Sequence, residues 1–369
     1  MWLTAQGNAT IQAYTINLSS GGLSLDGSAQ ATANAPTSIV VTPKGDAAFI
    51  SNSGTGSQSV GGGISAYTIN SDGTFKPAGS TILAGPTPSG MAINAAGTFL
   101  FVANQGSFDL TPPGALPGSI SVFSVSGASL TPVAGSPFST ETNGATVGTG
   151  PVSVAVSASG NYLYVANQFA NTVSSFQISS SGALTPLTTY PVGISPSAVF
   201  VSLAQGTIPA GQYLYVANAG SNNISGFAIC DVANASGCST PNGVLTSIAG
   251  SPFAAEPGPV AIAMDPTAPF LYAADEQANQ ISQYAWSSGT GALTALSPAA
   301  ISAGGSPVSV AIRSGVAATS TAAGIDYLYA ANLNASSVSV YTLNTTTGAL
   351  NVQGSPVTTF SQPSAIIVR

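Results

Sequence analysis

The stretch NYLYVANQFANTVSSFQI, Asn161–Ile178, contains two runs of alternating apolar and polar residues separated by polar turn residues. Alternation with a period of two is typical of β-strands, so the stretch predicts two strands joined by a turn. Related strings recur along the chain. The counterparts of Asn167, which ends the first run, are Asn52, Asn104, Asn218, Asp275 and Asn332. Because it recurs, the stretch is better interpreted as a unit of the scaffold than as a site.

Each unit contains two further runs besides this pair. A run that opens with proline precedes it, as in PVSVAV from Pro151, and a run such as GALTPL follows a turn rich in Ser, Thr, Asp and Gly. No stretch shows sustained helical periodicity, so each of the six complete units is predicted to have four short strands. The chain ends supply a seventh unit, because PSAIIVR at Pro363–Arg369 is a first strand and residues 1–35 contain three more.

A repeat of four strands every 51 to 63 residues predicts an all-β fold, a seven-bladed β-propeller with four antiparallel strands per blade. We expect one domain, 1–369, in which blade 7 is formed by 363–369 plus 1–35. Closing the ring in this way removes the exposed sheet edges that an open array would leave.

The units resemble the YVTN repeats of the lactonase-like seven-bladed propellers, a family similar to bacterial 6-phosphogluconolactonase. YVAN at Tyr164–Asn167 and Tyr215–Asn218 stands where that family has its tetrapeptide, and the resemblance covers essentially the whole chain. It implies the propeller fold, and it raises lactone hydrolysis as an activity. The Asn that ends the tetrapeptide is predicted to bond nearby backbone in the following turn.

The composition excludes several classes of function. The chain has 4 Lys+Arg, 11 Asp+Glu and no His, so charged residues make up 4%, against roughly 25% in a typical soluble domain. A net charge of −7 argues against nucleic-acid binding. No apolar run approaches the ~18 residues that a membrane span needs. With few groups to titrate, stability is expected to depend weakly on pH, as in an acid-tolerant protein.

Cys230 and Cys238 flank a short segment, CDVANASGC, and we predict a disulfide between them. Two free thiols are the alternative, and a metal site is less favoured because there is no second pair and no His. A disulfide indicates an oxidising compartment. We therefore expect an extracytoplasmic protein, secreted, periplasmic or at the cell surface, whose signal segment is not present in this chain.

Five acidic residues fall at one predicted face of the ring. In this connectivity the second-to-third loops and the blade-to-blade loops share a face, where propeller ligands usually enter; we call it the mouth face. Asp109 lies in a second-to-third insertion, Glu141 and Glu256 lie in blade-to-blade loops, and Asp275 and Glu276 end a second strand. They are either a shallow pocket for a cation or polyol-like ligand or ordinary solvated acids.

Asp275 is the most specific of these candidates because it replaces the repeated Asn, although an Asp can make the same turn bond. Lys44, Arg313 and Arg369 fall near the opposite face, and Lys76 is on an outer strand. The mouth face is thus predicted to carry acid and no base.

The missing residue types bear on catalysis. The resembled enzymes are associated with His and Arg at the channel mouth, and no such residue can be carried over to this chain. A phosphorylated lactone would also need cations around its phosphate. We therefore predict no catalytic residue, no cofactor and no metal, and a binding, surface or assembly module. Its partner would be a protein, a glycan or a small polar ligand at the mouth face, or a second copy. The alternative is a lactonase with Glu256 or Glu276 as general base.

Overall fold

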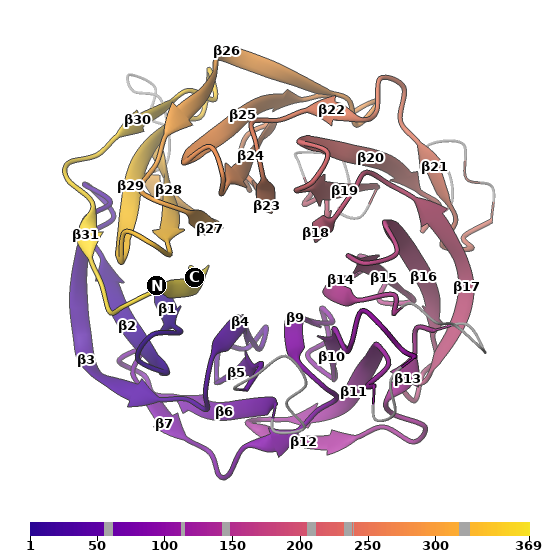
Figure 1. The fold of residues 1–369 in the computed structure, drawn as a ribbon. Coiled ribbons are helices and arrows are strands. Elements are labelled where there is room, and N and C mark those ends of the chain that lie inside the picture. The colour runs from indigo at the N-terminus through magenta and orange to yellow at the C-terminus, as the bar shows by residue number, and fades with distance from the viewer. Residues whose placement is uncertain are drawn as a thin grey trace.

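Seven β-sheets stand around a central axis in the computed structural model, which describes residues 1–54, 62–111, 115–141, 148–204, 212–231, 238, 240–316 and 325–369 (Figure 1). Each sheet is one blade of antiparallel strands, and the fold is the predicted seven-bladed propeller. In the part of the chain described here, no helix has the length and hydrophobicity to cross a bilayer.

The first strand of each blade lies nearest the axis and the second lies beside it. The inner strands are β4 (Pro36–Val41), β9 (Pro88–Ile93), β14 (Pro151–Val156), β18 (Pro196–Val201), β23 (Pro259–Met264), β27 (Pro307–Val316) and β32 (Pro363–Ile367). The second strands are β5 (Ala47–Asn52), β10 (Phe99–Asn104), β15 (Tyr162–Asn167), β19 (Tyr213–Asn218), β24 (Phe270–Asp275), β28 (Ile325–Asn332) and β1 (Trp2–Ala5).

The third and outer strands complete each blade. The third strands are β6 (Gly63–Ile69), β11 (Ser119–Ser126), β16 (Thr172–Ile178), β20 (Asn223–Ile229), β25 (Gln280–Trp286), β29 (Ser337–Asn344) and β2 (Thr10–Ile16). The outer strands are β7 (Phe75–Pro77), β12 (Ser129–Pro132), β17 (Leu184–Pro191), β21 (Leu245–Ser247), β26 (Leu293–Ser302), β30 (Leu350–Val352) and β3 (Leu23–Ala31). Short strands β8 (Ile82–Leu83), β13 (Phe138–Ser139), β22 (Phe253–Ala254) and β31 (Val357–Thr358) pair with third strands.

The ring closes through a blade built from both ends of the chain. Its strand order is β3-β2-β1-β32, and β32 pairs antiparallel with β1, with Trp2 opposite Ile367. Figure 1 shows the two termini beside β1 on the inner side of the ring, next to β27. Backbone hydrogen bonds therefore hold the ring shut.

The second strands carry the repeat because both of their faces are buried. All six residues of β15 are buried, and Tyr162 and Tyr164 pack in one core cluster with residues of the following blade, such as Leu214. Leu163 and Val165 pack in another cluster with the preceding blade. Large rings on one face and branched aliphatic side chains on the other fill the wedges between neighbouring blades.

The inner strands are built of small residues because neighbouring blades approach closely at the axis. A Cβ on Gly90 would lie 2.6 Å from the carbonyl oxygen of Val152 in the next blade. Ser197 Oγ donates to the Pro259 carbonyl at 2.8 Å, and Ser364 Oγ donates to the Pro36 carbonyl at 2.7 Å. Small hydroxyl side chains thus link adjacent inner strands by hydrogen bonds.

The repeated Asn has a structural role, but in the YVAN strand its partners differ from those predicted. Asn167 is fully buried, and its Nδ2 donates to Ser174 Oγ at 2.8 Å and to Thr172 Oγ1 at 3.1 Å. Both hydroxyls belong to the third strand of the same blade. The side chain therefore ties the second strand to the third instead of closing the turn through backbone.

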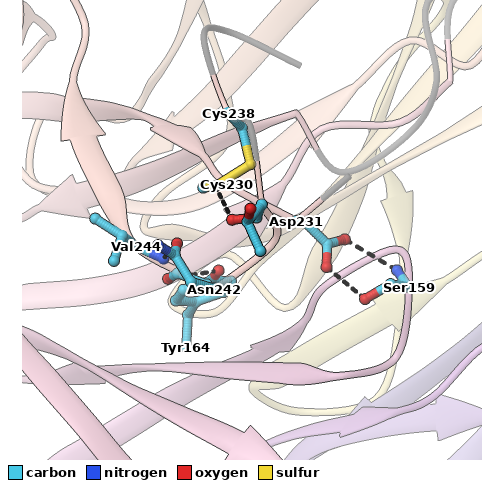
Figure 2. The surroundings of a disulfide bond; sticks show 9 residues. Ser159, Tyr164, Cys230, Asp231, Cys238, Asn242 and Val244 are labelled. Carbon is cyan, nitrogen blue, oxygen red and sulfur yellow. Dashed lines mark hydrogen bonds between the residues drawn. A yellow bond between two sulfur atoms is a disulfide. The ribbon is translucent and has the colours of Figure 1, made fainter. Parts of the chain in front are cut away.

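The predicted disulfide is present in the loop between β20 and β21. Cys230 and Cys238 are bonded, and their Cα atoms are 5.1 Å apart. Asp231, which follows Cys230, is buried against the β14–β15 turn of the neighbouring blade, as Figure 2 shows. Its carboxylate accepts from the Ser159 N–H at 3.0 Å and from Ser157 Oγ at 3.1 Å. The disulfide thus lies beside a contact between two blades.

Removing the disulfide by Cys230→Ser and Cys238→Ser together is expected to lower the free energy of unfolding by about 2.5 kcal/mol, since so short a loop restrains the unfolded chain only modestly. Urea unfolding with and without a reducing agent measures this. The double variant is the control, because its unfolding curve should not respond to the reductant. An unchanged wild-type curve on reduction would contradict the prediction.

Candidate functional site

Asp275 ends β24 on the mouth face, where most of the other blades have Asn. Its side chain is fully buried, and its Oδ2 accepts from the Ser282 N–H at 2.8 Å and from Ser282 Oγ at 2.7 Å. Its Oδ1 is buried and has no hydrogen-bond partner among the residues described. A buried carboxylate with one uncompensated oxygen disfavours its charged form.

The pKa of Asp275 follows from this environment. Burial raises the pKa to about 7, the two bonds from Ser282 act in the opposite direction, and the Glu256 carboxylate raises it further. Near neutral pH, Asp275 is therefore divided between its protonated and ionised forms. A carboxyl group poised at this pKa can accept or hold a proton under ordinary conditions.

Glu256 replaces a residue that contacts the repeated Asn in other blades. It stands three positions before the inner-strand proline, where four other blades have glycine; three of these lie against the repeated Asn, namely Gly85, Gly193 and Gly304. A Cβ on these glycines would lie 2.6 to 2.7 Å from the side chain of the Asn in the same blade. We number the blades from the one that begins with β4, so that β23–β26 form blade 5. In blade 5, acidic residues thus replace both the Gly and the Asn of this close pair. The Glu256 N–H donates to Ser282 Oγ at 3.2 Å, so one serine serves both acidic positions.

Glu276 completes the group, which we call the acidic corner: Glu256, Asp275 and Glu276. Its N–H donates to the Gly258 carbonyl at 2.8 Å, and its partly exposed carboxylate accepts from Ser306 Oγ at 3.4 Å. Ser306 Oγ in turn accepts from Asn334 Nδ2 at 2.9 Å. The acidic corner therefore extends by hydrogen bonds to the loops of blade 6.

The other two predicted acids lie in blades 2 and 3, apart from the acidic corner. Glu141 Oε1 accepts from the N–H groups of Gly118 and Thr149 at 2.9 and 2.8 Å, so this side chain joins two loops. Asp109 is exposed and accepts from the Thr111 N–H at 2.9 Å. These bonds lower the pKa of Asp109 and keep its carboxyl group ionised. Both side chains thus have local structural roles.

The sequence identified Asp275 as an exception to the repeat but missed its pairing with Glu256. Aligning the blades on the inner-strand proline would have revealed the pair, because Gly recurs at the position of Glu256. The serines were missed as well: Ser282 has counterparts in other blades, so nothing in the sequence distinguishes it.

The chemistry of the acidic corner is that of hydrogen-bond acceptors. Among the described residues, no three His, Cys, Asp or Glu side chains are arranged to hold a metal ion. The chain's four cationic residues all lie elsewhere: Lys76 is on the outer strand β7, Lys44 is in the β4–β5 turn, and Arg313 and Arg369 are at the far ends of inner strands. A carboxylate-lined corner without cations suits donor-rich, uncharged ligands.

Comparison with known proteins gives a consistent result for the fold. A family model described as "Lactonase, 7-bladed beta-propeller" matches residues 19–112, 93–203, 116–242 and 206–366. No curated protein matches the chain.

Two solved structures of similar fold are informative. One is a Bacteroides fragilis protein whose 6-phosphogluconolactonase assignment is provisional, with 17% identity and a TM-score of 0.76 over 99% of this chain and 96% of that one. The other is a periplasmic gluconolactonase from Pseudomonas aeruginosa, with 20% identity and a TM-score of 0.73 over 98% of this chain and 96% of that one. At these identities, the likeness shows the fold alone.

Proposed function

This chain belongs to the seven-bladed lactonase β-propeller family, and from that premise we propose that its acidic corner binds an uncharged, polyhydroxylated ligand of the sugar or sugar-lactone class. The observation that supports this most directly is the replacement of a Gly and Asn pair by Glu256 and Asp275. Carboxylates accept hydrogen bonds from neighbouring hydroxyl groups, and such charge-assisted bonds are stronger than neutral ones.

The charge distribution favours a neutral ligand over a phosphorylated one. Three carboxyl groups lie at this corner and all four cations of the chain lie elsewhere. A phosphate group would face the acidic side chains of Glu256 and Glu276 and would find no guanidinium or ammonium partner. We therefore expect the unphosphorylated sugar to bind in preference to its phosphate ester.

Hydrolysis of an uncharged lactone is the second candidate, and the raised pKa of Asp275 beside Glu256 favours it. In this scheme the partly exposed Glu256 takes a proton from a water molecule whose oxygen attacks the lactone carbonyl. The ring oxygen leaves with the proton that Glu256 took up, giving the open hydroxy acid. Asp275 is fully buried, so a substrate would not reach it directly, and it would act on Glu256 through the electrostatic interaction of the two carboxyl groups.

For the location of the protein, we propose an extracytoplasmic compartment, secreted, periplasmic or at the cell surface. The Cys230–Cys238 disulfide supports this, because such bonds persist in oxidising compartments and are rare in the cytosol.

The test is Glu256→Gln, which keeps the size of the side chain and removes its charge. We expect it to weaken binding of a neutral sugar or sugar lactone about tenfold, which corresponds to ~1.4 kcal/mol, as measured by calorimetry. If the protein is a hydrolase, turnover in a pH-stat assay should fall at least 100-fold, the usual contribution of a general base.

Asp109→Asn is the matched control, because it removes an acid from the same face outside the acidic corner. It should leave both binding and turnover unchanged. Equal losses in the two variants would show that the overall negative charge of this face, and not the acidic corner, determines binding. Absence of binding across a panel of neutral sugars and aldonolactones would reject the proposal.

A further inference from the structure

One position in the blade repeat behaves differently in blades 6 and 7. The sixth residue after the inner-strand proline is Thr, Asn, Ser or Asp in five blades, namely at Thr42, Asn94, Ser157, Ser202 and Asp265. Its side-chain oxygen accepts backbone N–H groups in the following turn, as Ser202 Oγ does from the Tyr213 N–H at 3.2 Å. The same position is Arg313 in blade 6 and Arg369 in blade 7.

An arginine cannot do what the other five residues do. Its guanidinium carries only hydrogen-bond donors, so it cannot accept the N–H groups of the turn. At this position of blade 6 the acceptor is therefore replaced by a cation, whereas in blade 7 no turn follows, because β32 and β1 come from opposite ends of the chain.

Both arginines line one cavity of about 280 Å³ on the face opposite the acidic corner, which we call the arginine pocket. Trp2 and Tyr14 supply aromatic walls, and Asp26 and Asp72 line it as well. The cavity lies where ring closure brings β27 beside the composite blade, the region in which Figure 1 shows both chain ends. Residues distant in sequence are thus assembled by the closure of the ring.

The two carboxylates of the pocket are engaged with their own strands and turns. Asp72 accepts from the Thr74 N–H at 2.9 Å and from Thr74 Oγ1 at 2.6 Å, bonds that lower its pKa. Asp26 accepts from Thr15 Oγ1 at 3.1 Å. Within the described ranges, neither carboxylate forms an ion pair with an arginine of the pocket.

The guanidinium groups therefore retain unused donors. Arg313 Nε is buried and has no hydrogen-bond partner in the described structure. Arg369 Nη2 donates to the Pro43 carbonyl at 3.3 Å, and its guanidinium lies against Gly45, where a Cβ would fall 0.8 Å from Nη1. A guanidinium presents its donors in a planar fork that matches the oxygens of a carboxylate or a phosphate.

We propose that the arginine pocket is a binding site for a small oxyanion, a phosphate or carboxylate group held between Arg313 and Arg369. The proposal is independent of the function proposed for the acidic corner, because it concerns the opposite face and a charged instead of a neutral ligand. The ring would then bind neutral polyols at one face and anions at the other.

Calorimetric titration with inorganic phosphate, and separately with malonate, tests the proposal at constant ionic strength set by chloride. We expect saturable binding with a stoichiometry of one. Arg313→Gln and Arg369→Gln should each weaken it at least tenfold, while Arg313→Lys should retain most of it. Circular dichroism of each variant establishes that the fold is intact.

Lys44→Gln and Lys76→Gln are the matched controls, since each removes one positive charge outside the arginine pocket. They should leave the affinity unchanged. If the lysine variants lose as much affinity as the arginine variants, net charge alone explains the effect and the proposal is overturned. Absence of saturable binding of either anion to the wild-type protein would also overturn it.

Discussion

Lowering the pH from 8 to 4.5 is expected to raise the free energy of unfolding of this protein by roughly 3 kcal/mol. Two buried carboxyl groups are the cause. Burial raises the pKa of Asp275 to about 7 and that of Asp265 to about 6, from an ordinary value of 3.8. In both cases the folded protein holds a proton that the unfolded chain releases.

The direction follows from proton binding. Between about pH 4 and pH 6.5 the folded state binds more protons than the unfolded state, so stability falls as the pH rises through this window. Above about pH 6 the Met1 amino group acts in the opposite direction, because burial lowers its pKa to about 6. Most acidic groups that form ion pairs in folded proteins behave in the opposite way. The composition predicts a weak dependence on pH; the structure instead predicts a clear one in which acid stabilises.

The surroundings of Asp265 explain why its pKa is raised. Asp265 is fully buried at the β23–β24 turn, and its Oδ1 accepts from the N–H groups of Thr267 and Ala268 at 2.7 and 3.0 Å. Asp326, which is also buried, accepts from Thr267 Oγ1 at 2.8 Å, and its charge raises the pKa of Asp265 further. Two buried carboxyl groups on adjacent blades thus meet at one threonine.

Chemical unfolding at pH 4.5, 6 and 8 measures the effect, with the Asp265→Asn and Asp275→Asn double variant as control. Its stability should not rise on acidification, because neither amide titrates. A wild-type unfolding midpoint that drops between pH 7 and pH 4 would contradict the prediction.

Restoring the repeat by Asp275→Asn alone is expected to stabilise the protein at pH 8 by roughly 3 kcal/mol, because the cost of ionising a buried group disappears. At pH 4.5 the wild-type Asp275 is already neutral, so the gain there should be small. Calorimetry or denaturant unfolding at the two pH values gives the difference directly.

The reciprocal change, Asn218→Asp, buries an ionisable carboxyl group at the equivalent position of blade 4. Asn218 is fully buried and its Nδ2 donates to Ser225 Oγ at 2.9 Å, the counterpart of Ser282. We expect a loss of roughly 3 kcal/mol at pH 8 that largely vanishes at pH 4.5. Asp109→Asn, on an exposed acid, should change neither value. A destabilised Asp275→Asn protein at pH 8 would show that the ionised form of Asp275 is compensated.

The fold could be predicted from the sequence alone, because the strand pattern recurs in every blade and the blades can be aligned on it. The sequence was less informative about the site. Asp275 was visible as a substitution in the repeat, but its electrostatic interaction with Glu256 depends on how the blade-to-blade loop lies over the strand end. Glu141 binds backbone N–H groups of two irregular loops, and no repeat predicts that arrangement.

The meeting of the two arginines in one pocket could not be predicted from the sequence either. Their positions near one face follow from strand order, yet their meeting in one cavity depends on closure of the ring and on the reach of two long side chains. Neither is encoded in a local pattern.

The pairing of β32 with β1 also constrains how the protein is made. During translation the first three strands leave the ribosome as a sheet whose β1 edge has no partner until the last strand has been synthesised. Such an edge can pair with other nascent chains. Completion of the ring must therefore wait until β32 has been synthesised.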